Sequence, residues 1–241
     1  MIMALLTLFG LDVVWNNVLV TVLTFIYVFS LVALMNLLVS RYRFPQDLSR
    51  KISHIGAGTL IAFWPLYNGG TGGHWTVYLN VSIFVLWIVL LTLKGFTADE
   101  NDEAVKTMTR TGDRHELLRG PLYFVIVGTI CGTLYFGTFA GVMAMAALGW
   151  GDGLAPMIGT RFGRMKYKVL SEKSLEGSLT VFIASALAGI FFVWLIVPAA
   201  LNPGRIILLS LIAAVAEGLS PKDWDNFLIP VAVIGASQFI L

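Results

Sequence analysis

The sequence predicts an all-α protein, a single polytopic bundle of seven to eight transmembrane helices. Of its 241 residues, 57% are hydrophobic and only 12% are charged, whereas soluble domains carry about 25% charged residues. Apolar runs long enough to cross a hydrocarbon core of about 30 Å recur along the whole chain. These observations exclude a soluble globular protein and predict one transmembrane domain over residues 1–241.

Eight apolar runs follow one another, and the second and last are short. They span residues 13–40, 52–66, 75–93, 117–136, 138–158, 178–201, 205–218 and 227–241. The first run has no basic leader and continues too far before its first Arg to be a cleaved signal peptide, so we expect it to stay as a helix. The single cysteine, Cys131, lies within an apolar run, which rules out a disulfide framework or a cysteine metal site.

The charged residues are distributed unevenly between the two faces of this bundle. If the eight helices alternate in direction, all Lys and Arg except Arg205 fall on one face, and all Asp and Glu except Asp12 fall there too. The positive-inside rule makes this face cytoplasmic and places both termini outside. The longest cytoplasmic loop, residues 94–119, alternates in charge and predicts a solvated amphipathic helix, with a lid over a ligand as the alternative.

Four acids stand at the cytoplasmic ends of different apolar runs, namely Asp152, Glu176, Glu217 and Asp225. A carboxylate in this position lies close to hydrocarbon and lacks the long stem with which a lysine reaches water. Each acid taken singly is commonly an N-cap or an ion-pair partner. Because four converge on one face, they predict a shared cation site.

The stretch GWGDGLAPMIGTRFGRMKYKVLSEKSLEGS, residues 149–178, joins two apolar runs through a glycine-rich and basic segment. Its glycines allow a backbone to approach a ligand closely, although glycines in membrane helices also pack helices together. They are Gly149, Gly151, Gly153, Gly159 and Gly163. Pro156 should bend the helix that contains it.

Lys173 and Ser174 come directly before the next apolar run. The amides and dipole of a helix N-terminus suit a phosphate, and a lysine adds a point charge. A plain N-cap role for Ser174 is the alternative. The usual nucleotide motifs and the Gly-x-Ser-x-Gly elbow are absent from the sequence, and His54, His74 and His115 lack zinc-ligand spacing.

Four segments in order resemble the CTP-dependent lipid kinase family, which includes phytol kinase, dolichol kinase and a CTP-using diacylglycerol kinase and is related in its membrane core to phosphatidate cytidylyltransferases. They are RKISHIGAG at 50–58, ELLRGPLYF at 116–124, GDGLAPMIGTRFGRMKYKVLSEKSLEGSLTVF at 151–182 and AEGLSPKDWDNFLIPV at 216–231. The resemblance covers most of the chain from Arg50 onward. The first apolar run carries no motif.

The resemblance implies a site for CTP and Mg²⁺ built from the matching positions. These are Asp152, Lys173, Ser174, Glu176, Gly177, Glu217, Asp225 and Asn226, with Arg50, Lys51 and His54 bordering the site from the second helix and Gly151, Gly153, Gly159, Arg161, Gly163 and Lys166 contributing from the nucleotide-binding loop 159–177 and the residues before it. Arg50 and His54 are spaced i and i+4, so they share one helical face.

Within that site, Asp152 and Asp225 suit Mg²⁺, with Glu217 as a further candidate ligand. Lys173, Arg161 or Lys166 would hold the triphosphate.

Two further roles stay open. Either Glu176 or Asp152 would accept the hydroxyl proton of the acceptor. Asn226 would either read cytosine or cap the last helix.

The expected function is therefore CTP-dependent phosphorylation of an isoprenoid alcohol, such as phytol, geranylgeraniol or a polyprenol, at the cytoplasmic membrane face. The expected partners are CTP, the lipid alcohol and membrane lipids, without nucleic acid, and a homo-oligomer is left open. The expected membrane is the cell membrane of a prokaryote, or the endoplasmic reticulum or a plastid membrane of a eukaryote. The alternatives are a cytidylyltransferase that forms CDP-lipid, a diacylglycerol kinase, and a transporter, whose acids should lie nearer the membrane midplane.

Overall fold

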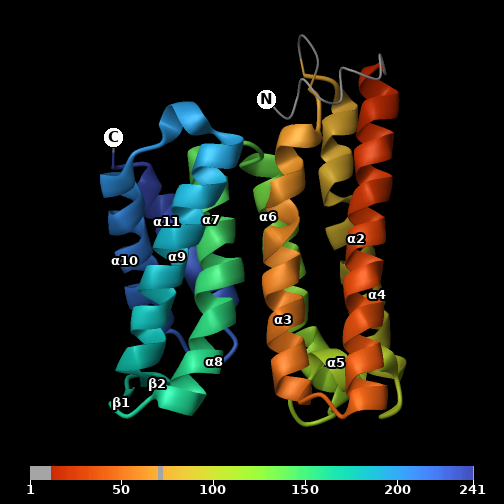
Figure 1. The fold of residues 1–241 in the computed structure, drawn as a ribbon, viewed down its shortest axis with the longest axis vertical. Coiled ribbons are helices and arrows are strands. Elements are labelled where there is room, and N and C mark those ends of the chain that lie inside the picture. The colour runs from red at the N-terminus through yellow and green to blue at the C-terminus, as the bar shows by residue number, and fades with distance from the viewer. Residues whose placement is uncertain (1–11, 70–72, 241) are drawn as a thin grey trace.

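The computed structural model describes residues 12–69 and 73–240, which fold as a bundle of helices running up and down along one axis (Figure 1). Residues 1–11 and Leu241, which belong to the predicted domain and to its last apolar run, lie outside the described residues. The elements of the first half are α2 (Val13–Tyr42), α3 (Gln46–Gly58), η2 (Thr59–Leu66), η3 (Trp75–Val81), α4 (Ser82–Thr97), α5 (Glu103–Met108), η4 (Arg114–Leu118) and α6 (Gly120–Leu134). Those of the second half are α7 (Phe139–Ala146), η5 (Ala147–Asp152), α8 (Gly153–Phe162), β1 (Lys166–Lys168), β2 (Glu172–Ser174), α9 (Leu175–Ile196), η6 (Pro198–Ala200), α10 (Pro203–Leu219) and α11 (Asp225–Ser237).

Five helical stretches in the described part of the chain are long and apolar enough to cross a membrane. They are Val13–Tyr42, Trp75–Thr97, Arg114–Leu134, Phe139–Phe162 and Leu175–Ile196. This agrees with a helical membrane protein. The predicted runs 52–66 and 205–218 are also helical, and the run 227–241 is helical as far as Ser237. These three helices do not reach the same length and hydropathy, so the count of seven to eight stays a prediction.

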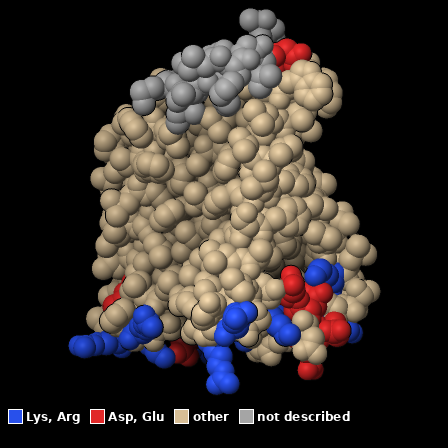
Figure 2. All heavy atoms as spheres, turned by 45° about the vertical axis from the view of Figure 1, so that its right-hand side comes forward, with Lys and Arg blue, Asp and Glu red and all other residues tan. Residues whose placement is uncertain are grey.

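Except for Asp12 and Arg205, which lie at the starts of α2 and α10, the charged residues gather at one end of the bundle. Figure 2 shows Lys, Arg, Asp and Glu in a band at the lower end, below an uncharged flank on the side in view. Large apolar side chains cover the outside of the helices, such as Leu34, Leu187 and Val231, which are 49%, 65% and 66% exposed. An uncharged, apolar flank is what a hydrocarbon environment requires. We call the lower end, formed by the α2–α3, α4–α6, α8–α9 and α10–α11 connections, the charged end.

Glycines bring α3 and η5 into direct backbone contact. A Cβ added at Gly58 would lie 2.4 Å from Cα of Gly149, and one added at Gly153 would lie 2.5 Å from Cγ1 of Ile55. On the opposite side, a Cβ at Gly151 would lie 2.3 Å from Oγ of Ser185 on α9. The glycines around Asp152 therefore pack helices together in this structure. Of the two roles considered for these glycines, helix packing is thus seen at Gly149 and at both glycines of the Gly-Asp-Gly sequence.

The long helix that carries Asp152 is irregular where Asp152 lies. Its middle section, η5, is π-helical, and Pro156 follows within α8. Proline has no amide hydrogen, so the carbonyl of Asp152 lacks the donor that an α-helix would supply from position 156. Pro156 was expected to bend this helix. The irregularity that the structure shows beside it is the π turn.

The connection between α8 and α9 contains a short β-hairpin, a local addition to an otherwise helical fold. Strands β1 and β2 pair in antiparallel register, with Tyr167 opposite Lys173 and Lys168 opposite Glu172. Alternation along a strand points Tyr167 and Lys173 to one face of the hairpin and leaves Lys166, Lys168 and Glu172 exposed. The sequence predicted only a loop over residues 159–177, because three-residue strands give almost no periodic signal.

The connection between α4 and α6 is docked on the bundle. Its one helix of six residues, α5, buries Ala104, Val105 and Thr107 and contacts α2 and α3. Nε2 of Gln46 on α3 donates to the carbonyl of Val105 at 3.0 Å, and Nζ of Lys94 lies 2.8 Å from Asp102. Part of the loop predicted as a solvated helix is thus a fixed component of the charged end.

We predict that Gly149→Ala lowers the thermal stability of the protein. The added methyl group would overlap the backbone of Gly58, and overpacking of this kind typically destabilises by about 1–3 kcal/mol. Thermal unfolding in detergent measures the change. The matched control is Gly235→Ala on α11, where an added Cβ meets no heavy atom of the described residues within 4 Å. Equal melting temperatures for the two variants would contradict the role of the glycine contact.

Candidate active site

A polar cleft with a volume of about 750 Å³ opens at the charged end. Its walls come from α3, α8, β2, α10 and the start of α11. Of the residues predicted for the site, the cleft is lined by Arg50, Lys51, Asp152, Gly159, Lys166, Lys173, Ser174, Gly177, Glu217 and Asp225. The structure therefore brings together residues from three of the four resembling segments. Of the four acids predicted to share a cation, Asp152, Glu217 and Asp225 line the cleft and Glu176 does not.

Asp152 is buried at the inner wall of this cleft, at the end of η5. It is only 4% exposed, and its Oδ2 lies 3.5 Å from Nε2 of His54 and 3.8 Å from Nζ of Lys51. Nε2 of His54 is also 2.9 Å from the carbonyl oxygen of Leu148, so this nitrogen carries the hydrogen and donates. A buried carboxylate is tolerated only with such partners, and here α3 supplies them.

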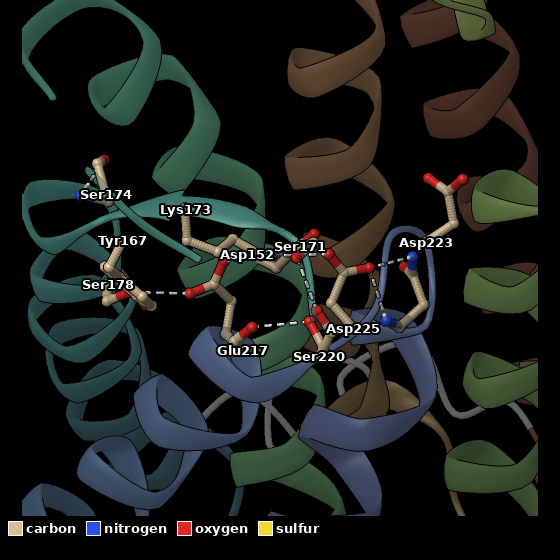
Figure 3. A network of polar contacts seen from close by, with 12 residues as sticks. Asp152, Tyr167, Ser171, Lys173, Ser174, Ser178, Glu217, Ser220, Asp223 and Asp225 are labelled. Carbon is tan, nitrogen blue, oxygen red and sulfur yellow. Dashed lines mark hydrogen bonds and ion pairs between the residues drawn. The ribbon is translucent and has the colours of Figure 1, made fainter. Parts of the chain in front are cut away.

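Lys173 lies at the centre of a second group of charges, drawn in Figure 3. Its Nζ is 2.6 Å from Oε1 of Glu217 and 3.4 Å from Oδ2 of Asp225. Burial lowers the pKa of Lys173, but the carboxylates of Asp225 and Glu217 raise it by more, so its pKa lies above the ordinary value. The side chain therefore stays an ammonium. Oγ of Ser178 donates to Oε2 of Glu217 at 3.1 Å and lies 2.6 Å from the hydroxyl of Tyr167.

The start of α11 presents Asp225 and Asn226 together. The backbone and side-chain amides of Asn226 both donate to Oδ1 of Asp225, at 3.1 and 3.2 Å. Asn226 is 5% exposed. Asp225 therefore has one oxygen oriented by Asn226 and the other facing Lys173.

Arg110 and Asp223 belong to this site but were not singled out in the sequence. The guanidinium of Arg110, in the α4–α6 connection, lies 3.0 Å from Oδ1 of Asp223, and both residues line the cleft. Asp223 has a positive φ of 68°, a left-handed conformation that aspartate adopts more readily than most residues. The pair joins segments 113 residues apart, and no local pattern signals such a contact.

Several predicted residues lie away from the cleft. The carboxylate of Glu176 points to the α8–α9 connection, where Oε1 accepts from the amide of Arg164 at 2.9 Å. Arg161 is exposed and does not line the cleft, and Gly151, Gly153 and Gly163 also lie outside its lining. Lys166 lines the cleft edge but pairs with Glu172 at 3.1 Å on the exposed face of the hairpin.

Ser174 is the N-cap of α9, because its Oγ accepts from the amide of Gly177 at 3.1 Å. The amide of Leu175 donates to the carbonyl of Met165. The amides of Leu175 and Gly177 thus already have partners within the protein, and the ammonium of Lys173 is the stronger anion-binding group at this point.

A second, mostly apolar cavity adjoins the cleft and runs upward between α2, α3, α4 and α6. Its volume is about 110 Å³. Apolar side chains line it along its length, and they include Val28, Leu31, Leu60, Phe84, Leu91 and Phe124. Residues that line both cavities are Arg50, Lys51, Arg110, Asp152, Asp223 and Asp225. The two spaces therefore meet at the buried acids.

Asp152 and Asp225 both line the cleft, where their carboxylates could hold Mg²⁺ brought in by a phosphate ligand. Among the described residues, no three His, Cys, Asp or Glu side chains group as a ready-made metal site. Mg²⁺ in phosphate-binding proteins commonly takes only one or two carboxylates and completes its shell with phosphate oxygens and water. Glu217 is less available, since both of its oxygens have partners, Lys173 and Ser178.

Plant proteins are similar to this chain over most of its length. A wheat (Triticum aestivum) protein named probable phytol kinase, chloroplastic, is 35% identical over 218 residues, which cover 86% of this chain and 71% of the wheat protein. Phytol kinase 1, chloroplastic, of Arabidopsis thaliana is 29% identical over 87% of this chain and 71% of its own length. Farnesol kinase, chloroplastic, of the same plant is 32% identical over 73% of this chain and 58% of its own length. No family model and no solved structure matches the chain.

We predict that Glu217→Ala destabilises the protein by about 3–5 kcal/mol, because it leaves the ammonium of Lys173 buried with an incomplete set of partners. Thermal or denaturant unfolding in detergent measures the effect. Removing both charges in the double variant Lys173→Met/Glu217→Met should restore most of the lost stability. The exposed pair Lys166–Glu172, with side chains 64% exposed, is the control, and Glu172→Ala should have little effect. A large loss in the control, or none in Glu217→Ala, would contradict the buried pair.

Proposed function

Since the chain belongs to the phytol kinase family, whose members phosphorylate an isoprenoid alcohol, we propose that it transfers the γ-phosphoryl group of CTP to such an alcohol at the charged end of the bundle. Phytol and geranylgeraniol are the proposed substrates. The choice of CTP rests on the resemblance of the motif segments, and the choice of an isoprenoid alcohol rests on the named relatives.

The observation that carries the proposal is the meeting of a polar cleft with an apolar cavity at buried acids. A lipid kinase must hold a highly charged nucleotide and an apolar tail in one site and bring their reacting atoms together. The cleft offers cations for phosphates, with Lys51, Lys173 and Arg50 among its lining residues. The apolar cavity offers walls for an isoprenoid tail, and Asp152 lies where the two spaces join.

Positioning and charge neutralisation account for most of the catalysis in phosphoryl transfer. The alcohol oxygen forms a bond to the γ-phosphorus while the bond from that phosphorus to the bridging oxygen of CDP breaks, and CDP leaves. Asp152 is the proposed acceptor of the hydroxyl proton, because it faces both cavities. Lys173 and Lys51 would hold phosphate oxygens. Mg²⁺, held by Asp225 together with phosphate oxygens and shared with Asp152, would neutralise phosphate charge.

Glu176 is not the proposed base, although the sequence left it as a candidate. Its carboxylate accepts hydrogen bonds from backbone amides of the α8–α9 connection and lies outside both cavities. We propose instead that it fixes the loop before the hairpin, and so acts on Lys173 through the backbone.

The charged end is proposed to face the compartment that supplies the nucleotide, which the positive-inside rule makes the cytoplasmic side. The relatives are named chloroplastic, which supports a plastid membrane as the location. In either membrane the alcohol would arrive laterally from the bilayer, while the nucleotide would arrive from water.

The direct test supplies the purified protein in detergent, with Mg²⁺, with γ-labelled CTP and in turn phytol, geranylgeraniol, a longer polyprenol and diacylglycerol. We expect label in the first two alcohols and release of CDP. ATP, GTP and UTP added in parallel test the nucleotide preference. Release of pyrophosphate with a lipid phosphate, and no label in any alcohol, would refute the kinase and establish a cytidylyltransferase.

We predict that Asp152→Asn lowers kcat by at least about a hundredfold, since a positioned base contributes roughly 10²–10⁴ in rate. Initial rates with labelled CTP measure it, and thermal unfolding checks that the protein is folded. The control is Asp12→Asn at the opposite end, where asparagine can still cap α2. Wild-type rates in the Asp152 variant would remove Asp152 from the chemistry.

Filling the apolar cavity should change the preference for tail length. Val28 lies toward the far end of this cavity on α2, so Val28→Phe shortens the space. We expect kcat/KM to fall more for phytol than for the shorter farnesol, in competition assays with both alcohols. Leu34→Phe is the matched control, because Leu34 is 49% exposed on the same helix and lines neither cavity. An equal loss for both alcohols would mean that the tail does not reach this depth.

A further inference from the structure

The two cavities divide the predicted site residues into two sets, and Asn226 falls on the apolar side. It lines the apolar cavity together with Ser53 and His54, and none of these three lines the polar cleft. A residue that reads cytosine would be expected on the nucleotide side. The position of Asn226 therefore favours a role toward the alcohol.

The carboxylate of Asp225 determines the orientation of the Asn226 side-chain amide. Oδ1 of Asp225 accepts hydrogen bonds from both the backbone amide and the side-chain amide of Asn226. A carboxylate only accepts hydrogen bonds, so the NH₂ group must face Asp225 and the carbonyl oxygen must face away from it. The assignment of oxygen and nitrogen in this side chain thus follows from its partner.

The carbonyl oxygen of Asn226 is buried and lacks a hydrogen-bond donor. Within residues 12–69 and 73–240, Oδ1 of Asn226 has no partner, and the residue is 5% exposed. Buried carbonyl oxygens nearly always have a donor, because leaving one unpaired is unfavourable. Three cations line both cavities, and their ion pairs are with other groups: Lys51 with Asp152, Arg110 with Asp223 and Arg50 with Asp47. None of them donates to Oδ1 of Asn226.

We propose that Oδ1 of Asn226 accepts a hydrogen bond from the hydroxyl of the lipid alcohol, so that Asn226 is the residue that recognises the alcohol group. The inference rests on the proposed function. An isoprenoid alcohol has a single hydrogen-bond donor, its hydroxyl, at one end of an apolar tail. A tail in the apolar cavity would carry that hydroxyl to the end where Asn226, Asp225 and Asp152 meet. On phosphoryl transfer the hydroxyl proton passes to the carboxylate of Asp152 as the oxygen–phosphorus bond forms.

This assignment gives Asn226 a second effect through Asp225. By holding one oxygen of Asp225, the amide leaves the other oxygen toward Lys173, which is 3.4 Å away. One side chain thus connects the alcohol to the acid that faces the phosphates. Its loss should therefore affect alcohol binding first and the rate second.

The experiment compares steady-state kinetics of wild-type protein, Asn226→Ala and Asn226→Leu with phytol and CTP. The expected result is a rise in the KM for phytol of about tenfold, the effect of one lost hydrogen bond, with the KM for CTP within about twofold of wild type. Ser185→Ala is the matched control, since Oγ of Ser185 is also buried without a partner in the described part of the chain but lines neither cavity. It should leave both KM values unchanged.

A measurement on the ligand keeps the inference testable if an Asn226 variant fails to fold. Phytene, the hydrocarbon with the same tail and no hydroxyl, should inhibit wild-type protein at concentrations at least about tenfold above the KM for phytol. In a folded Asn226→Leu protein the difference between the inhibitory concentration of phytene and the KM for phytol should disappear. A raised KM for CTP with an unchanged KM for phytol would overturn the inference in favour of cytosine reading. Unchanged KM values for CTP and for phytol would also overturn the inference, because they would show that neither substrate binds Oδ1 of Asn226. Wild-type protein that labels no alcohol would refute the proposed function itself.

Discussion

The close backbone contact between Gly58 and Gly149 is the constraint on which the site depends. It presses α3 against η5 so that Lys51 and His54 reach the buried carboxylate of Asp152. Any side chain at either glycine would separate the two helices and leave an acid in a membrane-spanning segment without the lysine and histidine that face it, which is strongly unfavourable. The close packing of the two helices and the ion pairing of Asp152 therefore both depend on the absence of side chains at Gly58 and Gly149.

The other ion pairs extend this arrangement by joining elements that lie far apart in the sequence. Lys173 ties the hairpin to α10 and α11, and Arg110 ties the α4–α6 connection to Asp223. Lys51, Lys173 and Arg110 thus each meet an acid from a distant part of the sequence before any ligand binds. Such a site is close to neutral at rest, so a polyanionic ligand can enter by exchanging partners with cations that are already in place, and the acids released can face a metal ion or a hydroxyl.

The sequence predicted the membrane fold, the gathering of charges at one end and the convergence of Asp152, Lys173, Glu217 and Asp225, because hydropathy and charge placement act over whole helices. It did not predict the hairpin, whose strands are three residues long, or the pair of Arg110 and Asp223, whose contact spans loops. Glu176 was misjudged as facing the site because helical spacing does not tell whether a first-turn carboxylate turns inward or toward a neighbouring loop. The direction of the Gly-Asp-Gly glycines depends on a π turn that no sequence periodicity reveals.

Because of that π turn, the number of residues in the stretch from Ala147 to Asp152 determines how α8 is oriented relative to α7. A π turn holds about one residue more than an α turn, so α8 is rotated by about 100° from the phase that α7 alone would set. Both α7 and α8 nevertheless pack against α9. Inserting or deleting one residue in this stretch would therefore rotate α8, the half of the helix that lines the cleft. The number of residues between Ala147 and Asp152 thus determines the orientation of the site as much as their identities do.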